Sequence, residues 1–228
     1  MEKLNIGIIK KNLDTFFIGK NIVYFEELDS TNSFAAKVIK DKKSIDAINV
    51  LNGTVIIAET QTEGKGRFDR KWVSPPGGLW FSIILQPEIG LDIFSKITLL
   101  SAAVLVEIIA DNYLSLEESK FLHVKWPNDI YYKDKKFAGI LAESEKLDNK
   151  NYLIVGIGIN VNNNIANKLE GGRKSFKATS LKSILGLYID RNDLLLKILT
   201  NFEKNYISFT DGVDFKSIFK KIETKLIF

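Results

Sequence analysis

The sequence predicts an α+β fold in which a mixed, largely antiparallel sheet is flanked by helices. The expected strands follow one another in pairs between helices, whereas a doubly wound parallel sheet would alternate strand and helix one by one. Residues 95–114 show the broad apolar face of a long helix. Hydrophobic residues make up 45% of the 228 residues, which suffices for one large core. This content excludes a chain that is mostly intrinsically disordered.

The first half of the chain alternates short apolar runs with helical patterns. Residues 29–32 (Asp-Ser-Thr-Asn) favour a helix N-terminus, and apolar residues recur at helical spacing after them. Short apolar runs that end at a polar residue or at Pro87 are typical of buried strands. The expected elements, in order, are a weak helix or arm over 1–20, a strand over 22–26, a helix from 31 to about Asp46, a strand over 54–58, a loop over 59–78, a strand over 79–85 and a helix over 95–114.

The second half contains more extended patterns before it returns to helix. Pro127 and the turn-forming Asn128 and Asp129 predict two short strands joined by a tight turn. Two longer extended runs flank the polar segment 146–151, which is typical of a hairpin. The expected elements are strands over 123–126, 130–132, 136–145 and 152–162, helices over 178–187 and 190–206, and a last short helix from near Asp214.

The composition excludes several classes of protein. The chain has no Cys and a single His, His123, so disulfides, thiolate catalysis and Cys-ligated metals are excluded, and a Ser-His-Asp hydrolase is disfavoured. No segment approaches the roughly 20 apolar residues of a membrane-spanning helix, and the N-terminus lacks a secretory core. A net charge of +4 leaves nucleic-acid binding open without implying it. We expect a cytoplasmic protein with no membrane partner.

Rare residue types gather in a glycine-containing loop at 64–72. Two of the four Arg residues, Arg67 and Arg70, lie there together with Trp72. Glycine lets backbone N–H groups approach an anion, and Arg adds forked donors for phosphate or carboxylate oxygens. The spacing fits neither a Walker loop nor a dinucleotide fingerprint, since Asp69 stands at the third glycine position. A solvated hairpin is the alternative, but the clustering favours a phosphate site.

Further candidates lie in the expected strands. Lys125 follows an apolar strand, where a lysine either reaches the surface or points into a site. Gly139, Gly156 and Gly158 would weaken their strands unless a ligand or another backbone comes close. They therefore predict either a floor with space above it or bulges in a packed sheet. Asn160 and Asn162 would share one face, and His123 is expected to be an ordinary sheet-face residue.

Taken in order, six segments resemble the catalytic domain of the biotin protein ligases. Order and spacing hold from about Ile22 to Tyr206. The resemblance implies a fold like that of the class II aminoacyl-tRNA synthetases, with a catalytic domain over 22–228 preceded by an arm at 1–21. The segments are 28–32 (Leu-Asp-Ser-Thr-Asn), 58–61 (Ala-Glu-Thr-Gln), the loop 64–72 with Ser74-Pro75, 125–129 (Lys-Trp-Pro-Asn-Asp), 138–143 (Ala-Gly-Ile-Leu-Ala-Glu) and 156–162 (Gly-Ile-Gly-Ile-Asn-Val-Asn).

The resemblance implies an ATP-dependent ligase that activates biotin as biotinyl-5'-AMP and transfers it to a specific lysine of a biotin carrier protein, a carboxylase subunit. ATP and biotin would be substrates and Mg²⁺ is expected, although no carboxylate stands out as its ligand. Which carrier is modified, and whether the chain forms a homodimer, stays open. The alternatives are a lipoate or octanoate ligase, which Gln61 and the loop disfavour, and a non-catalytic biotin- or nucleotide-binding module, which the retained Lys125 and Arg67 disfavour.

The resemblance also implies roles for individual residues. Lys125 and Arg67 would be catalytic, with Lys125 at the biotin carboxylate and the α-phosphate, and Trp72 would pack on adenine. The biotin-binding residues would be Ser30, Thr31, Asn32, Gln61, Gly64, Lys65, Arg67, Lys125 and Gly139. The nucleotide-binding residues would be Lys65, Arg67, Arg70, Trp72, Asn128, Gly156, Gly158 and Asn160.

The chain departs from the family pattern in three places. The family loop usually has the pattern Gly-Arg-Gly-Arg-x-Gly-Arg, and here Lys65 replaces the first Arg and Asp69 the last Gly. Lysine keeps the charge but loses the forked geometry of Arg. The residues before Ile22 are too few for the family's N-terminal DNA-binding domain, so no operator binding is expected. The chain also stops at Phe228, roughly where the family's small C-terminal domain would begin.

Overall fold

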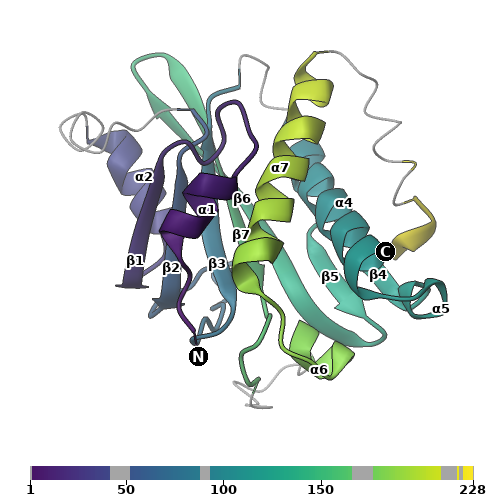
Figure 1. Ribbon diagram of the computed structural model, residues 1–228. Coiled ribbons are helices and arrows are strands. Elements are labelled where there is room, and N and C mark those ends of the chain that lie inside the picture. Colours follow the sequence, from purple (N-terminus) through teal and green to yellow (C-terminus); the bar gives the residue numbers. More distant parts are fainter. Residues whose placement is uncertain are drawn as a thin grey trace.

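The computed structural model describes residues 2–41, 52–87, 93–165, 177–211, 220 and 223–227. Figure 1 shows how its helices and strands are arranged. They are, in chain order, α1 (Ile6–Asn12), β1 (Ile22–Leu28), α2 (Thr31–Lys40), β2 (Val55–Gln61), β3 (Leu79–Leu85), α4 (Ile93–Tyr113), α5 (Leu116–Ser119), β4 (Leu122–Lys125), β5 (Asp129–Tyr132), β6 (Lys135–Leu147), β7 (Lys150–Ile159), α6 (Leu181–Leu185), α7 (Arg191–Thr210), the 3-10 turn η1 (Glu223–Lys225) and β8 (Leu226–Ile227).

The strands form one mixed sheet in the order β1-β2-β3-β7-β6-β5-β4-β8. The pairs β1·β2 and β4·β8 are parallel, and the other neighbours are antiparallel. The hairpin β6·β7 lies at the centre, and its register places Gly139 directly opposite Gly158. This architecture confirms the predicted α+β class with a mixed, largely antiparallel sheet.

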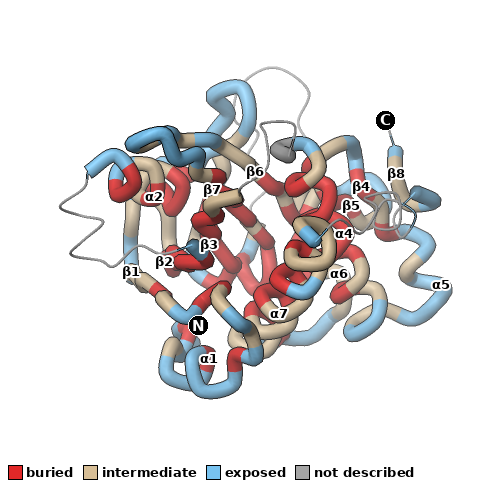
Figure 2. The backbone as a smooth tube through the Cα atoms, turned by 90° about the horizontal axis from the view of Figure 1, so that it is seen from above, coloured by how far each residue is buried: buried red, intermediate tan, exposed pale blue. Residues whose placement is uncertain are grey.

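Helices cover both faces of the sheet. The helices α4 and α7 pack against each other on the large core, while α2 packs on β3, β6 and β7 over a smaller apolar cluster that includes Ala35 and Ile39. Every residue of β3 is buried, and Figure 2 shows the buried residues running through the middle of the sheet. The strands at the centre are therefore rigid supports for whatever residues they present at their ends.

The N-terminal segment, which the sequence predicted as a weak helix or arm, contains α1 and packs on the large core. Leu4, Ile9, Leu13 and Ile18 are buried members of that core. The carboxylate of Glu203, on α7, accepts hydrogen bonds from the backbone N–H groups of residues 16, 17 and 18. Helix α7 thus holds this segment against the sheet.

Several helix boundaries differ from those expected. Helix α2 ends at Lys40 with Asp41 as its C-cap, so the expected continuation towards Asp46 is wrong at residue 41, and residues 42–51 lie outside the described residues. Helix α6 is shorter than the predicted helix 178–187, because Ser180 caps its start and Gly186, at φ +74°, ends it. The helix expected near Asp214 lies outside the described residues. No described helix combines the length and the apolar character that crossing a membrane requires.

Candidate active site

The start of α2 carries a buried network of polar side chains. Ser30 caps the helix, and its hydroxyl accepts from the backbone N–H of Ser33. The backbone N–H of Thr31 donates to Gln61 Oε1 over 2.8 Å. Gln61 in turn donates from Nε2 to Ser74 Oγ over 2.7 Å. The sequence motif around Ser30 and the end of β2 are thereby joined.

The same network extends across the sheet to β3 and β6. Ser82 Oγ lies 2.7 Å from Thr31 Oγ1 and 2.6 Å from Asn32 Oδ1. Asn32 donates from Nδ2 to Glu143 Oε2 over 2.7 Å. The sequence analysis included Ser74 and Glu143 in the resembling segments without giving them a role, and it did not mention Ser82. Ser82 could have been found, because it is the one hydroxyl residue in the otherwise apolar run 79–85.

Gly156 provides the space for Asn32. A Cβ atom at Gly156 would lie 2.2 Å from Asn32 Oδ1, which is far closer than atoms approach one another. A close approach does occur at this strand glycine, but the approaching group is a side chain of the protein, whereas a ligand or another backbone was expected.

The loop 64–72 is a tight hairpin. The backbone N–H of Gly66 donates to Arg70 O over 2.7 Å, and that of Trp72 donates to Gly64 O over 2.8 Å. Phe68 and Asp69 form the turn at φ +56° and +57°, so Asp69 occupies a left-handed conformation that glycine adopts more easily. The departure from the family pattern at Asp69 therefore keeps the turn and adds a charge.

Arg67 ties this hairpin to the turn between β4 and β5. Its Nη1 donates to Asn128 Oδ1 over 2.7 Å. Asn128 is buried and donates from Nδ2 to Ile140 O over 3.2 Å. Two segments that the sequence analysis selected independently, the loop and the segment 125–129, thus meet in one place.

Trp72 lies over the glycine floor of the β6·β7 hairpin. A Cβ atom at Gly158 would lie 2.7 Å from Trp72 Nε1, and one at Gly139 would lie 3.1 Å from Trp72 Cζ3. The indole also meets Trp80 edge-on, with ring centroids 6.3 Å apart. Trp72 Nε1 is buried and has no hydrogen-bond partner among the described residues. The two glycines therefore make room for an aromatic ring, which retains one unsatisfied donor.

A lysine also lies against this indole. Lys136 Nζ lies 4.8 Å from the centroid of the Trp72 ring and 2.7 Å from Asp129 Oδ1. Burial lowers the pKa of Lys136; Asp129 opposes this shift, and the positive charges of Arg70 and Lys125 add to it. Arg70 and Lys125 are thus both close enough to act on Lys136. The sequence analysis missed Lys136, which nothing in its own strand pattern distinguishes from its neighbours.

The remaining predicted residues lie around these groups. Lys125 is exposed at the end of β4, and Lys65 pairs with Lys71 across the base of the loop hairpin. Asn160 accepts a hydrogen bond from Asn163 Nδ2 over 2.9 Å. Asn162 holds the backbone of Ile189 through two hydrogen bonds, so its role in the structure is to anchor the segment before α7.

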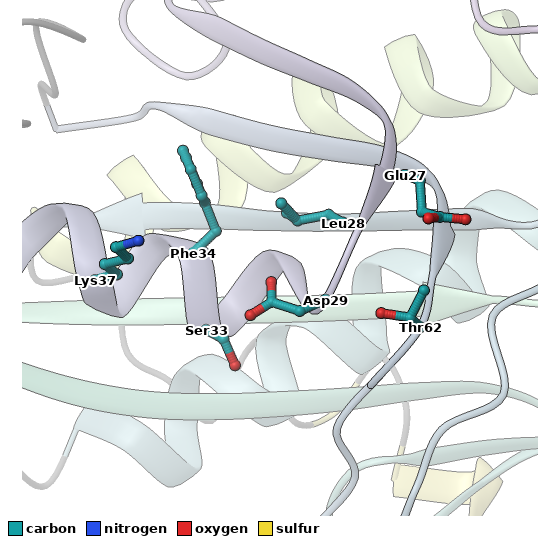
Figure 3. A pocket seen from close by; sticks show the side chains of 7 residues that line it. All are labelled: Glu27, Leu28, Asp29, Ser33, Phe34, Lys37 and Thr62. Atoms are coloured by element: carbon teal, nitrogen blue, oxygen red, sulfur yellow. The ribbon is translucent and has the colours of Figure 1, made fainter.

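Two open hollows flank α2. One of about 470 Å³ lies between the end of β1 and α2, and Figure 3 shows Phe34 and Lys37 from the helix facing Leu28 across it. The other, of about 510 Å³, is lined by Lys65, Glu143 and α2. The first contains none of the predicted site residues. We take the indole and the polar network as the candidate active site, because Lys136, Arg67 and the buried hydrogen-bonding groups lie there.

The described residues contain no group of three or more His, Cys, Asp or Glu side chains that could hold a metal ion. The expected Mg²⁺ therefore has no such cluster of ligands in the part of the chain that the structure describes.

The Biotin/lipoate A/B protein ligase family model matches residues 24–160. The bifunctional ligase/repressor BirA of Bacillus subtilis (strain 168) is 36% identical over 208 residues, which cover 90% of this chain and 59% of that protein. The human biotin–protein ligase is 32% identical, over 92% of this chain and 28% of its own length. The chain thus spans less than two thirds of these relatives.

Solved structures agree with the sequence relatives. The structure of a biotin protein ligase from Aquifex aeolicus in complex with biotin and ATP is 34% identical and has a TM-score of 0.69. The match covers 91% of this chain and 79% of that one. A biotin protein ligase from Leishmania major in complex with biotin has the same TM-score at 23% identity, which shows the fold.

Proposed function

This chain belongs to the biotin/lipoate A/B protein ligase family, and from that premise we propose that it joins biotin to a carrier protein in two steps. In the first step an oxygen of the biotin carboxylate attacks the α-phosphate of ATP, and pyrophosphate leaves. In the second step the amine of a carrier lysine attacks the carbonyl carbon of biotinyl-5'-AMP, and AMP leaves. The observation that carries the proposal is the Arg67–Asn128 hydrogen bond, because it brings the cationic loop to the strand end that carries Lys125.

The charged residues suit the phosphate chemistry of the first step. Phosphoryl transfer depends mostly on positioning and on stabilising negative charge. Lys125 and Arg67 are the catalytic cations of this proposal, and Lys65, Arg70 and Asn128 contribute to the phosphate side. Mg²⁺ would reach the site on the nucleotide and neutralise part of its charge.

The polar network at the start of α2 and the residues around Trp72 would bind different substrates. Ser30, Thr31, Asn32 and Gln61 would hold the ring end of biotin by hydrogen bonds, with Gly64, Lys65 and Gly139 beside the rest of the molecule. Trp72 would face the nucleotide, as its position over the Gly139–Gly158 floor supports. Gly158 and Asn160 belong to this nucleotide side, and Gly156 contributes by seating Asn32.

Biotin-dependent exchange of labelled pyrophosphate into ATP tests the first step. We expect exchange with biotin, and none with lipoate or octanoate. Exchange with lipoate alone would assign the chain to the lipoate branch of the family. No exchange with any acid, from protein shown to be folded, would support a binding module instead. Transfer of labelled biotin to a carrier domain of a carboxylase tests the second step.

A further inference from the structure

Arg191 connects the N-terminal end of α7 to the turn that follows the cationic loop. This turn, 75–78 (Pro-Pro-Gly-Gly), leads from the loop and Ser74 into β3. We infer that Arg191 is a positioning residue, which holds the turn and, through Trp80, the indole of Trp72 over its glycine floor. The inference rests on the proposed function, since it concerns the nucleotide that Trp72 would face.

Arg191 is buried and bridges three acceptors. Its Nη1 donates to Glu59 Oε2 over 2.8 Å and to Gly78 O over 2.9 Å, and its Nη2 donates to Glu2 O. Arg191 is the first residue of α7, where the helix dipole disfavours a cation, so its charge does not serve the helix itself. A planar guanidinium can reach these acceptors at once, whereas an ammonium group lacks the forked geometry. The side chain is therefore suited to join Gly78 to the N-terminal segment.

A second contact holds the same turn from the same side. The backbone N–H of Asn162 donates to Gly77 O over 2.8 Å, next to the Gly78 oxygen that accepts from Arg191. The side chain of Asn162 is itself fixed by two hydrogen bonds to the backbone of Ile189, just before α7. The segment that begins α7 thus fixes two successive carbonyl groups of the turn.

Trp80 carries the position of the turn to the indole of Trp72. A Cβ atom at Gly78 would lie 2.0 Å from Trp80 Cζ2, so the ring of Trp80 lies directly against the backbone of the turn. Trp80 is completely buried, and its Nε1 donates to Pro75 O over 3.1 Å. Strand register places Trp80 beside Gly158, and its ring meets that of Trp72 edge-on. Because protein interiors are closely packed, a shift of the turn displaces Trp80 and with it the wall beside Trp72.

The biotin side of the loop has an anchor of its own. The backbone N–H of Gln61 donates to Ser74 O over 3.1 Å, and Gln61 Nε2 donates to Ser74 Oγ over 2.7 Å. These bonds join Ser74 to the end of β2 without using the turn. Loss of the contact from Arg191 should therefore affect the nucleotide more than biotin.

The variant Arg191→Lys tests the inference, with Glu203→Ala as a matched control. Lysine keeps a positive charge beside Glu59 but cannot hold the three acceptors together. Glu203 lies on the same helix and also holds the N-terminal segment, but its hydrogen bonds go to the backbone of residues 16–18. We expect the KM for ATP in pyrophosphate exchange to rise about tenfold in Arg191→Lys, with the KM for biotin unchanged. Glu203→Ala should keep both values.

Acrylamide quenching of tryptophan fluorescence tests the same contact without any substrate. The chain has three Trp residues, so with Trp126→Phe in every variant the emission comes from Trp72 and Trp80 alone. We expect quenching to increase in Arg191→Lys, because the two rings lose their fixed support. Quenching should stay at the level of the Trp126→Phe parent in Glu203→Ala.

The double variant Arg191→Met/Glu59→Gln, which leaves no unpaired buried charge, takes the place of Arg191→Lys if that variant does not fold. An unchanged KM for ATP or unchanged quenching in a folded variant would overturn the inference, and so would equal effects in Glu203→Ala. Absence of biotin-dependent exchange in the wild type would instead overturn the proposed function. The quenching would then still decide whether Arg191 holds the two rings.

Discussion

Arg67 connects the loop and the sheet through a single side-chain contact. Its partner Asn128 is buried and is itself held by Ile140 O, so the guanidinium meets a fixed oxygen. A flexible loop that carries a charge would otherwise lose rotamer entropy whenever it ordered over a substrate. The contact therefore lowers the cost of bringing the cations of the loop to the site.

Lys125→Ala should lower the rate of pyrophosphate exchange by about 10²–10³-fold, because it removes a cation that would stabilise the negative charge developing on the phosphate. Lys125 is exposed, so the free energy of unfolding should stay within about 0.5 kcal/mol of the wild type. Lys135→Ala, an exposed lysine of β6, is the control and should leave exchange unchanged. Normal exchange in Lys125→Ala would remove Lys125 from the catalytic role.

Lys136 should limit activity at alkaline pH. Burial lowers the pKa of this lysine, so it loses its positive charge at a lower pH than an exposed lysine does. Arginine stays protonated throughout the accessible range. In Lys136→Arg, the alkaline decline of pyrophosphate exchange should therefore move to higher pH. Identical alkaline profiles for the wild type, Lys136→Arg and the control Lys135→Arg would show that this charge is not used.

At the scale of elements, β7 accommodates both the polar network and the indole of Trp72 from one strand. Gly156 and Gly158 lie two residues apart and so face the same side of the sheet. The first accommodates Asn32 of the polar network, and the second accommodates the indole of Trp72. The antiparallel register with β6 then places Gly139 opposite Gly158, which widens the floor under the indole.

Alanine at these two glycines should separate the substrates. Gly156→Ala displaces Asn32 and should raise the KM for biotin about tenfold or more, since overpacking costs about 1–3 kcal/mol. Gly158→Ala displaces Trp72 and should raise the KM for ATP in the same way. Steady-state exchange kinetics measure both constants, and each variant serves as the control for the other. Equal effects on both constants in both variants would contradict this division.

At the scale of the whole molecule, the N-terminal segment and α7 cover the large core on the face away from α2. Two buried carboxylates hold the N-terminal segment in place. Glu203 accepts from the backbone of residues 16–18, and Glu59 accepts from Leu4 N over 2.7 Å and pairs with Arg191 over 2.8 Å. The segment 1–21 thus packs on the core face of the sheet that lies away from α2, and the residues of the candidate site belong to the proposed ligase domain, 22–228.

Glu203→Ala should lower the free energy of unfolding by about 2–4 kcal/mol, because it leaves the buried backbone N–H of Ile18 and the partly buried ones of Phe16 and Phe17 without their acceptor. Urea unfolding measures the change. Lys204→Ala, at the adjacent exposed position, should stay within about 0.5 kcal/mol of the wild type. Equal stability of the two variants would mean that solvent replaces the carboxylate.

The sequence alone predicted the fold class, the family and the strands β1 to β7 in their order along the chain, but not β8. The predicted strand over 79–85 coincides with β3, because a short run that is apolar except for Ser82 suits a strand buried on both faces. Helix ends were predicted less well. The end of α2 at Lys40 has no glycine or proline to mark it. Helix α6 is capped by Ser180 and Gly186, but serine and glycine also occur away from helix ends, so neither residue marks a boundary by itself.

The sequence by itself identified candidate site residues such as Arg67, Trp72, Lys125 and the strand glycines. Composition shows which residue types are rare, and periodicity depends only on neighbours along the chain. Only the tertiary structure decided which of them meet. The hydrogen bond from Arg67 to Asn128 and the contact between Asn32 and Gly156 join residues more than 60 positions apart. Glu143, Ser82 and Lys136 became visible for the same reason. Their significance lies in partners that strand register and helix packing bring within hydrogen-bonding distance, and no local sequence pattern encodes those distances.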